Sequence, residues 1–286
     1  MLKLKWFLYS IFHRFLLLLP RRSGYALAYF MGSLAYVFSR RGRSNVMSNL
    51  SVVMPETAGK ERAKTARQVF INFAKYLTDF LTAERIDIEY IKDHVEFADL
   101  SVLLKAKEEG RGVILLTAHL GNWELGGGVL SICGHAVHAV ALPHLDEKTN
   151  DLFNRQRRLM QMEVIPTGVA VKRCFSVLKQ GKILALLGDK DFSGNGIETS
   201  IFSRRVILPR GPAFLSAKLD VPVIPAFILR REDDSYYLSV DDPVYPKKEN
   251  GQMQSEEELT SLYAAAIERN IRKSPSQWFM FEQYFI

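Results

Sequence analysis

The stretch Gly112–Gly127, GVILLTAHLGNWELGG, decides the fold of this chain. Its first part, Gly112–Ala118, is a short continuous apolar run that begins with a glycine, and this pattern predicts a buried, parallel β-strand. Gly121 permits a sharp turn after the strand, and Asn122 is a good N-cap for a helix that follows. We therefore expect a strand–turn–helix corner with His119 at its bend.

His119 and Glu124 lie on the two sides of this corner. On one continuous helix their spacing would turn them away from each other, but across a corner they can fold back and meet. Glu124 would occupy the first helical turn, where the helix dipole favours its charged form. A carboxylate beside an imidazole fixes the tautomer and stabilises the imidazolium, as a general base for a hydroxyl nucleophile requires. A core histidine near an ordinary first-turn acid is the alternative.

Apolar runs elsewhere in the chain alternate with segments of helical periodicity. Strands are predicted at His135–Leu142, Lys182–Leu187, Val221–Leu229 and Tyr236–Val240, and helices at 60–81, Asp146–Met162, Gly211–Leu219 and from Ser255, where Ser255 and Glu258 form a capping box. The prolines of Val221–Leu229 predict an edge strand or an irregular one. The alternation predicts an α/β fold with a mixed, largely parallel central sheet flanked by helices, and ligands beyond the carboxyl ends of the strands.

Two apolar runs, Trp6–Pro20 and Gly24–Phe38, precede this body. Each is about 15 residues long, whereas a spanning helix needs roughly 20, and basic residues flank both. A signal peptide fits poorly, because no small-residue cleavage site follows the first run. The pattern favours helices that lie in or dip into the cytoplasmic leaflet of a membrane, with two buried helices of a soluble protein as the alternative. We expect a membrane-associated helical segment at 1–45 and a single α/β domain at 46–286.

Composition narrows the classes of function. The 286 residues are 48% hydrophobic and 24% charged, which is typical of a globular protein with a full core. The net charge of +7 suits an anionic membrane surface, a phosphorylated substrate or an acidic partner, whereas the scattered basic residues form no nucleic-acid-binding motif. Cys133 and Cys174 have no metal-binding spacing, which argues against structural zinc and a disulfide framework and favours a reducing, cytoplasm-facing location.

Several motifs, in order along the chain, resemble those of the lipid A biosynthesis acyltransferases, the lauroyl and myristoyl transferases, to which the mycobacterial phosphatidylinositol mannoside acyltransferases are related. The stretch Thr117–Gly127 (TAHLGNWELGG) resembles the core motif of that family. The other matching segments are Arg43-x-Asn45-x3-Asn49-Leu50 followed by Met54-Pro55, Phe153–Arg157 followed by Val164–Pro166, Gly188–Phe192, Leu208–Ala213, and Pro275-x-Gln277-Trp278. The resemblance covers nearly the whole chain.

The chain departs from the family pattern at three places. Met54 replaces a phenylalanine, Gln161 replaces a glycine, and the tail Trp278–Glu282 lacks the Trp/His/Arg-rich ending of the lipid A enzymes. These departures bear on the identity of the acceptor more than on the chemistry.

The resemblance implies a glycerol-phosphate acyltransferase-like fold. It also implies transfer of a fatty acyl group from an acyl thioester, on acyl carrier protein or coenzyme A, to a hydroxyl of a membrane glycolipid such as a lipid A precursor. His119 would be the general base and Glu124 would orient it, with no metal, no other cofactor and no covalent acyl-enzyme. The expected location is the cytoplasmic face of the inner membrane, with peripheral or single-pass attachment.

Charged residues near the strand ends are candidates for substrate binding. Arg155 and Arg157 would grip phosphates or sugar acids of the acceptor, and Arg157 matches the family's arginine best. Solvated arginines on a helix face are the alternative. Asp189 and Asp191 could hold an arginine or bind a hydroxyl, but two carboxylates without further ligands make a poor metal site.

Four further candidates complete the predicted site. Arg210 and Gly211 open a helix, whose N-terminus is an anion site suited to phosphate or pantetheine. Asn122 and Trp123 follow the proposed base, and Trp123 is either a packing residue or a wall of an acyl tunnel.

Three other functions are consistent with the sequence. The first is acyl transfer to another lipid, such as a phosphoglycolipid, an aminolipid or a lysophospholipid. The second is a non-catalytic membrane-binding relative, which would have no need of a base and its carboxylate. The third is a serine hydrolase, which the absence of a Gly-x-Ser-x-Gly elbow disfavours.

Overall fold

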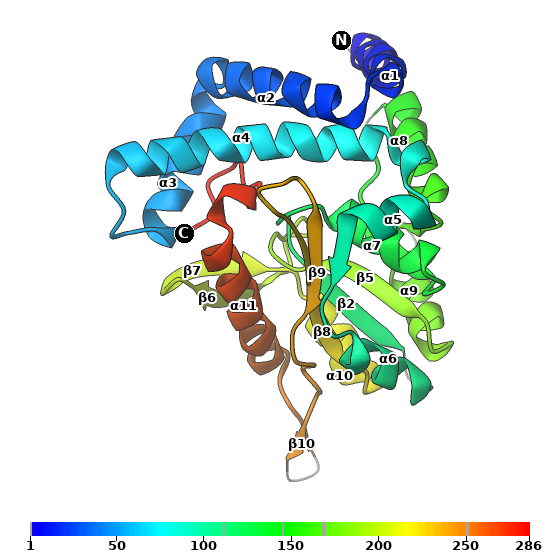
Figure 1. Cartoon of the computed structure of the whole chain (residues 1–286). Helices are drawn as coiled ribbons and strands as arrows, with labels where there is room; N and C mark the ends of the chain where they lie inside the picture. The colour runs from blue at the N-terminus through cyan, green and yellow to red at the C-terminus, as the bar shows by residue number, and fades with distance from the viewer. Residues whose placement is uncertain (1, 111, 145, 168–169, 250–251) are drawn as a thin grey trace.

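The computed structural model describes residues 2–110, 112–144, 146–167, 170–249 and 252–286. Within these ranges, the central sheet has seven strands in the order β1 (Val95–Phe97), β9 (Tyr236–Val240), β8 (Val223–Arg230), β2 (Val113–Thr117), β5 (Ile183–Leu187), β3 (Val137–Ala141) and β4 (Glu163–Pro166) (Figure 1). The five strands from β8 to β4 are parallel, whereas β9 is antiparallel to β8 and parallel to β1. The predicted mixed, largely parallel sheet is confirmed.

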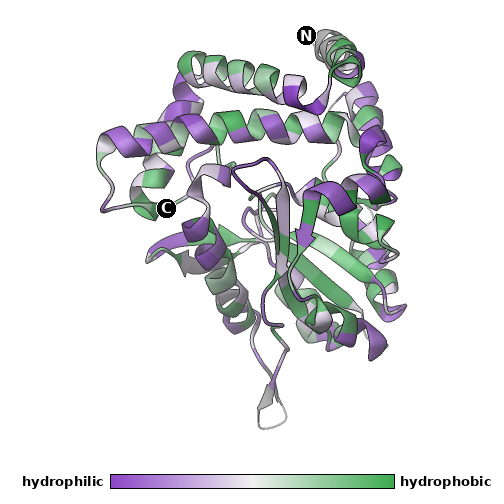
Figure 2. Ribbon diagram, in the orientation of Figure 1, coloured by the Kyte–Doolittle hydropathy of each residue, from purple (hydrophilic) through white to green (hydrophobic). Residues whose placement is uncertain are grey.

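Strand β2 supplies the centre of the core, because its side chains alternate between the two faces of the sheet. Ile114 and Leu116 pack on one face, with α9 (Ala170–Lys179), α10 (Gly211–Leu219), α11 (Glu256–Lys273) and the hairpin of β6 (Ile197–Ile201) and β7 (Arg204–Leu208). Val113 and Leu115 pack on the other, with α5 (Ile88–His94), α6 (Ser101–Glu108), α7 (Trp123–Ile132) and α8 (Glu147–Leu159). Figure 2 shows the central strands as mostly hydrophobic between helices of mixed character. This is the α/β fold that the sequence predicts.

Of the two alternatives predicted for Val221–Leu229, an edge strand or an irregular one, the edge strand is wrong. Strand β8 lies inside the sheet, between β9 and β2. Pro225 is tolerated there because the registered pairs with β9 begin one residue later, at Ala226. The Pro225 carbonyl still accepts a hydrogen bond of 2.8 Å from the N–H of Asp241.

Four helices begin the chain: α1 (Leu2–Leu18), α2 (Arg21–Phe38), α3 (Arg40–Val53) and α4 (Gly59–Leu81). Helix α2 runs beside α4 over one end of the sheet (Figure 1). Gly32 permits this close approach, because a Cβ there would lie 2.6 Å from the Cα of Ile71. The helix predicted at 60–81 is confirmed.

The association of the first two helices with a membrane stays a prediction. In the described part of the chain, every helix is too short or too polar to cross a membrane. Helix α3 runs through position 45, and the division of the chain at that position also stays a prediction.

The remaining elements are two or three residues long. They are η1 (Ala83–Arg85), β10 (Lys248–Glu249), β11 (Gln252–Met253) and η3 (Pro275–Gln277). At the start of α11, Ser255 and Glu258 form the predicted capping box. After η3 the chain returns to the end of β2, where Leu120 forms an antiparallel bridge with Trp278.

Candidate active site

The corner after β2 has the predicted geometry. Gly121 has φ +67°, a conformation that favours glycine, and a Cβ there would lie 2.0 Å from the carbonyl oxygen of Ile228. Asn122 is the N-cap of α7, and its side-chain oxygen accepts a hydrogen bond of 3.2 Å from the N–H of Leu125. The turn therefore holds His119 at the carboxyl end of a central strand.

Asp189 is the carboxylate that binds His119. Thr117 of β2 is in register with Leu187 of β5, so His119 and Asp189 each lie two residues beyond a paired position. The imidazole Nδ1 lies 2.8 Å from Oδ1 of Asp189, and the backbone N–H of His119 donates to Oδ2 at 3.0 Å. The indole N–H of Trp278 also donates to Oδ2, at 3.3 Å. Two neighbouring parallel strands thus place a histidine and a carboxylate side by side.

Burial and the contact between the two side chains shift the pKa values of His119 and Asp189. Burial alone would lower the pKa of His119, but the charge and the hydrogen bond of Asp189 outweigh burial and raise that pKa above its ordinary value. Burial alone would raise the pKa of Asp189, but the imidazole and the hydrogen bonds from His119 and Trp278 lower it. Asp189 is therefore an anion that fixes the Nδ1–H tautomer of His119 and leaves Nε2 as the acceptor.

The prediction that Glu124 orients His119 requires correction. Glu124 lies in the first turn of α7, as expected, but its carboxylate faces Arg157 of α8. The Nε of Arg157 lies 3.1 and 3.0 Å from the two carboxylate oxygens, and Nη2 lies 2.6 Å from Oε1. The direction of the helix carries Glu124 onto the face of α7 that meets α8. Its negative charge still adds to the raised pKa of His119.

Arg157 was expected to grip the acceptor, and the structure gives it another partner. Both Arg157 and Glu124 are buried, and the guanidinium also donates to the side-chain oxygen of Asn154 at 3.2 Å. In this structure the arginine is therefore engaged within the protein, and it fixes α7 against α8.

Three other predicted binding residues lie away from the imidazole pair. Arg155 is exposed and contacts Glu84 at 3.3 Å. Arg210 is exposed and bound to Glu256 by hydrogen bonds of 2.5 and 3.0 Å. Gly211 is the first residue of α10, as predicted. Substrate binding by these residues stays a prediction.

Asp191 shapes the loop that follows β5. Its carboxylate accepts hydrogen bonds from the backbone N–H groups of Ser193, Gly194 and Gly196. Within the described ranges, no group of three or more His, Cys, Asp or Glu side chains could hold a metal ion. The expectation of a metal-free site stays a prediction.

Aromatic rings flank the imidazole of His119. The ring of Trp123 lies edge-on to it with centroids 5.1 Å apart, and Trp123 also stacks on Tyr76 at 4.4 Å. On another side lies Phe192, which is 54% exposed and 6.4 Å from the imidazole. The His119 side chain keeps 21% of its surface exposed, so a substrate can reach it. His119 therefore lies at a partly exposed position with aromatic rings on two sides.

Asp79 is the main residue that the sequence reasoning missed. It lies on the buried face of α4, and its carboxylate accepts hydrogen bonds from Tyr25 of α2 (2.5 Å), Asn122 of the corner (3.3 Å), Arg230 of β8 (2.5 Å) and Tyr236 of β9. We call these five residues the Asp79 cluster. The available signal was an acidic residue on the apolar stripe of the helix predicted at 60–81.

The C-terminal motif supports the same corner. Gln277 donates to the carbonyl of Arg230 at 2.8 Å and accepts from its N–H at 2.9 Å, and its own carbonyl accepts from Gly121 at 3.0 Å. Asn49 of α3 donates to the carbonyl of Glu282 at 2.7 Å and so anchors the tail. The segments around Asn49 and Gln277, from the two ends of the chain, therefore surround the end of β2.

Comparisons with known proteins place these features in a family. Residues 2–286 match the bacterial lipid A biosynthesis acyltransferase family. A phosphatidylinositol mannoside acyltransferase of Mycolicibacterium smegmatis is 22% identical over 261 residues, covering 88% of this chain and 82% of the relative. A lipid A biosynthesis palmitoleoyltransferase of Escherichia coli is 23% identical over 260 residues, with 89% and 82% covered. A lipid A biosynthesis acyltransferase of Haemophilus influenzae is 24% identical over 249 residues, with 82% and 74% covered.

Proposed function

The chain belongs to the bacterial lipid A biosynthesis acyltransferase family and is an O-acyltransferase of that type. From this membership we propose that it moves a fatty acyl group from an acyl thioester to a hydroxyl of a membrane glycolipid. The family implies a lipid acceptor and an acyl donor. The observation that carries the finer proposal is the His119–Asp189 pair, which leaves Nε2 of an accessible imidazole free to take a proton.

The reaction needs one base and no covalent intermediate on the enzyme. Nε2 of His119 takes the proton of the acceptor hydroxyl as its oxygen attacks the thioester carbonyl carbon. The tetrahedral intermediate collapses, the carbon–sulfur bond breaks, and the thiolate takes the proton back from the imidazolium. Asp189 stabilises the imidazolium between these two steps.

The surroundings of His119 suit an acyl chain. Trp123 and Phe192 present aromatic surface on two sides of the imidazole, and Trp123 continues into rings of α4 and the C-terminal tail through Tyr76 and Phe279. A hydrocarbon chain against these rings would hold the thioester carbonyl near Nε2.

The acceptor and the donor are proposed at the level of chemical class. One relative is named for phosphatidylinositol mannoside and another for lipid A biosynthesis, and both names refer to lipids. A membrane glycolipid such as a lipid A precursor is therefore the proposed acceptor, and acyl carrier protein or coenzyme A is the proposed carrier of the acyl group.

A membrane acceptor suits the surface of the N-terminal helices. Large apolar side chains are exposed along them: Phe7, Ile11, Phe15 and Leu18 on α1, and Tyr29, Phe30, Met31, Leu34, Val37 and Phe38 on α2. Such a surface favours the interfacial region of a bilayer, with basic residues at the headgroups. The proposed location is the cytoplasmic face of the inner membrane.

The test compares His119→Ala with His135→Ala, a matched loss of imidazole away from the site. Purified full-length protein receives a radiolabelled acyl thioester and a bacterial lipid extract, and the labelled lipid is identified by mass spectrometry. His119→Ala should lose roughly 10²–10⁴ in turnover with unchanged circular dichroism, and His135→Ala should keep wild-type turnover. Equal turnover in His119→Ala and wild type would contradict the proposed base. Labelled lipid without sugar would contradict the proposed acceptor.

A further inference from the structure

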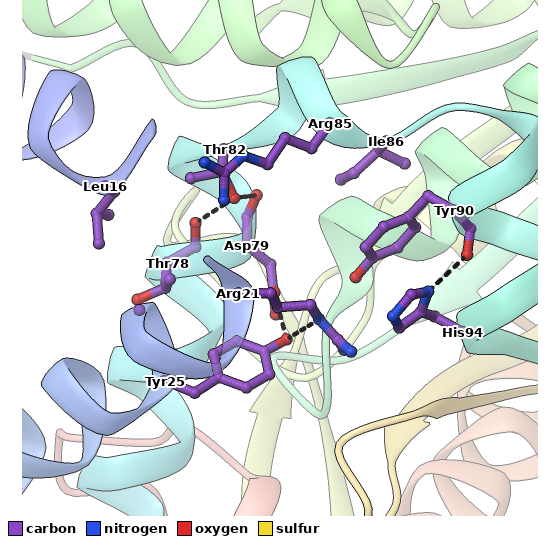
Figure 3. A pocket seen from close by; sticks show the side chains of 11 residues that line it. Leu16, Arg21, Tyr25, Thr78, Asp79, Thr82, Arg85, Ile86, Tyr90 and His94 are labelled. Carbon is purple, nitrogen blue, oxygen red and sulfur yellow. Dashed lines mark hydrogen bonds between the residues drawn. The ribbon is translucent and has the colours of Figure 1, made fainter. Parts of the chain in front are cut away.

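A cavity lies at the junction of α1 and α2, apart from the His119 site. The cavity measures about 260 Å³ and is partly open to solvent. Its walls come from α1, the first turns of α2, the end of α4, η1 and α5 (Figure 3). This volume exceeds that of one bound water, which takes about 30 Å³ in the liquid, so the cavity can hold a small molecular group. Neither His119 nor Asp189 lines it.

The charge around this cavity is positive. Arg21 and Arg85 line it, and Asp79 is the one acidic residue among the lining residues that the structure describes. The Asp79 carboxylate is already matched by Arg230 at 2.5 Å and by hydrogen bonds from Tyr25 and Tyr236. The cavity therefore has a surplus of cationic side chains over available carboxylates.

Arg21 in particular has neutral partners. Its Nε donates to the Tyr25 hydroxyl at 3.1 Å, and its Nη2 donates to the carbonyl oxygen of Asp234 at 2.5 Å. Arg85 likewise donates to the carbonyls of Leu17 and Leu19 at the end of α1. Among the residues that the structure describes, no carboxylate lies within 4.0 Å of either guanidinium, because Glu84 pairs with Arg155 and His13 and Asp79 pairs with Arg230. A partly buried guanidinium among neutral acceptors favours an anionic ligand.

Tyr90 adds a neutral donor. Its hydroxyl points into the cavity, on the side of Arg21 (Figure 3). The neighbouring His94 stacks on Tyr90 with ring centroids 4.5 Å apart, and its Nδ1 lies 3.1 Å from the Tyr90 carbonyl oxygen. This contact leaves Nε2 of His94 for another partner. An arginine fork beside a phenol hydroxyl suits the oxygens of a phosphate group.

The other walls are apolar. Leu16 and Ile86 line the cavity together with the backbone of Gly24. The exposed Phe15 and Leu18 lie on α1 near the same junction. A ligand that fills the cavity would thus meet cations at one side and hydrocarbon at another.

We propose that this cavity binds a phosphate-bearing group through Arg21 and Tyr90, with adjoining hydrocarbon against Leu16 and Ile86. Phosphate is the shared chemistry of two sources, the headgroup of a membrane phospholipid and free inorganic phosphate. The proposal does not depend on acyl transfer at His119, because the cavity and the base share no residue.

The test is calorimetric titration of the full-length protein in a non-ionic, phosphate-free detergent. The probes are inorganic phosphate, dihexanoyl phosphatidic acid below its micelle concentration, and dihexanoylglycerol as the neutral control. Arg21→Gln and Tyr90→Phe remove the two donors. Arg22→Gln is the matched control, because Arg22 is the neighbouring exposed arginine and lies outside the cavity lining. Circular dichroism and the thermal midpoint report folding.

The expected result is binding of a phosphate probe that Arg21→Gln weakens at least about tenfold and Tyr90→Phe weakens several-fold. Arg22→Gln should bind like wild type, and dihexanoylglycerol should not bind. Tighter binding of phosphatidic acid than of inorganic phosphate assigns the site to a lipid headgroup, and equal binding assigns it to free phosphate. The proposal is overturned if wild type binds neither phosphate probe. It is also overturned if Arg22→Gln weakens binding as much as Arg21→Gln, or if Tyr90→Phe, folded, binds like wild type.

Discussion

Arg157 holds both oxygens of the Glu124 carboxylate across the interface of α7 and α8. The two side chains keep only 10% and 9% of their surface exposed. Glu124 belongs to the same turn-and-helix segment as His119, so this ion pair fixes the helix that follows the His119 corner without touching the imidazole.

Loss of Arg157 should destabilise the fold strongly. Arg157→Ala leaves the Glu124 carboxylate buried without its partner, a situation that typically costs about 3–5 kcal/mol in the free energy of unfolding. Urea denaturation followed by circular dichroism measures this loss. Arg155→Ala is the control, because the Arg155 side chain is 56% exposed and an ion pair of this kind contributes roughly 0–1 kcal/mol. Equal denaturation midpoints for the two variants would contradict the assignment of Arg157 to the fold.

Replacement of Asp189 should change the pH dependence of catalysis. The base must be unprotonated, so turnover should rise with pH through the raised pKa of His119. Asp189→Asn removes the negative charge that raises this pKa. The rising limb of the pH–rate profile should therefore move to lower pH, while the maximal rate falls because the imidazole loses its orienting partner.

A steady-state pH profile of kcat for both proteins measures this shift, and Asp191→Asn serves as the control. Asp191 binds backbone N–H groups of its own loop, so its replacement should leave the position of the limb unchanged. A limb in Asp189→Asn that stays in place or moves to higher pH would count against the pairing.

Gly121 should be intolerant of a side chain. In Gly121→Ala the new Cβ would meet the carbonyl oxygen of Ile228 at 2.0 Å, in addition to the strain of φ +67°. Gly194 is the matched control, because it has φ +74° but open space around its Cβ. Gly194→Ala should lose roughly 1–2 kcal/mol in the free energy of unfolding. Gly121→Ala should lose clearly more and should also lose acyl transfer. Thermal denaturation and an activity assay of both variants would settle the comparison, and equal losses would refute the close contact.

Asp79 should be a stability residue as well as a neighbour of the corner. Asp79→Ala removes the nearer of the two carboxylates around Arg230, whose side chain is 6% exposed. The expected loss in the free energy of unfolding is roughly 3 kcal/mol. Asp233→Ala, an exposed change whose hydrogen bonds are confined to its own turn, should leave the urea midpoint in place. A midpoint in Asp79→Ala close to that of wild type would show that the cluster contributes little.

Local patterns in the sequence predicted the elements well. The run Gly112–Ala118 became β2, and the glycine, N-cap and first-turn acid after it occupy the expected positions. These features depend on residues close together in the chain, so their spacing carries the information. The central part of the fold and the place of His119 at the end of β2 could therefore be predicted from sequence alone.

Partners distant in sequence could not be predicted in the same way. The partner of His119 depends on the register of β2 with β5, and that of Glu124 on the packing of α7 against α8. Neither is set by spacing along the chain. The interior position of β8 likewise depends on where its pairing with β9 begins, whereas the prolines alone suggested an edge strand or an irregular one.

The Asp79 cluster has a consequence for how the chain can be shortened. One of its donors, Tyr25, comes from α2, while the others come from the corner after β2 and from strands β8 and β9. Removal of residues 1–38 to obtain a protein that is easier to handle would therefore take away one donor to the same carboxylate that Asn122 contacts. One face of α2 is thus part of the packing that supports the corner after β2, although much of its other surface is exposed.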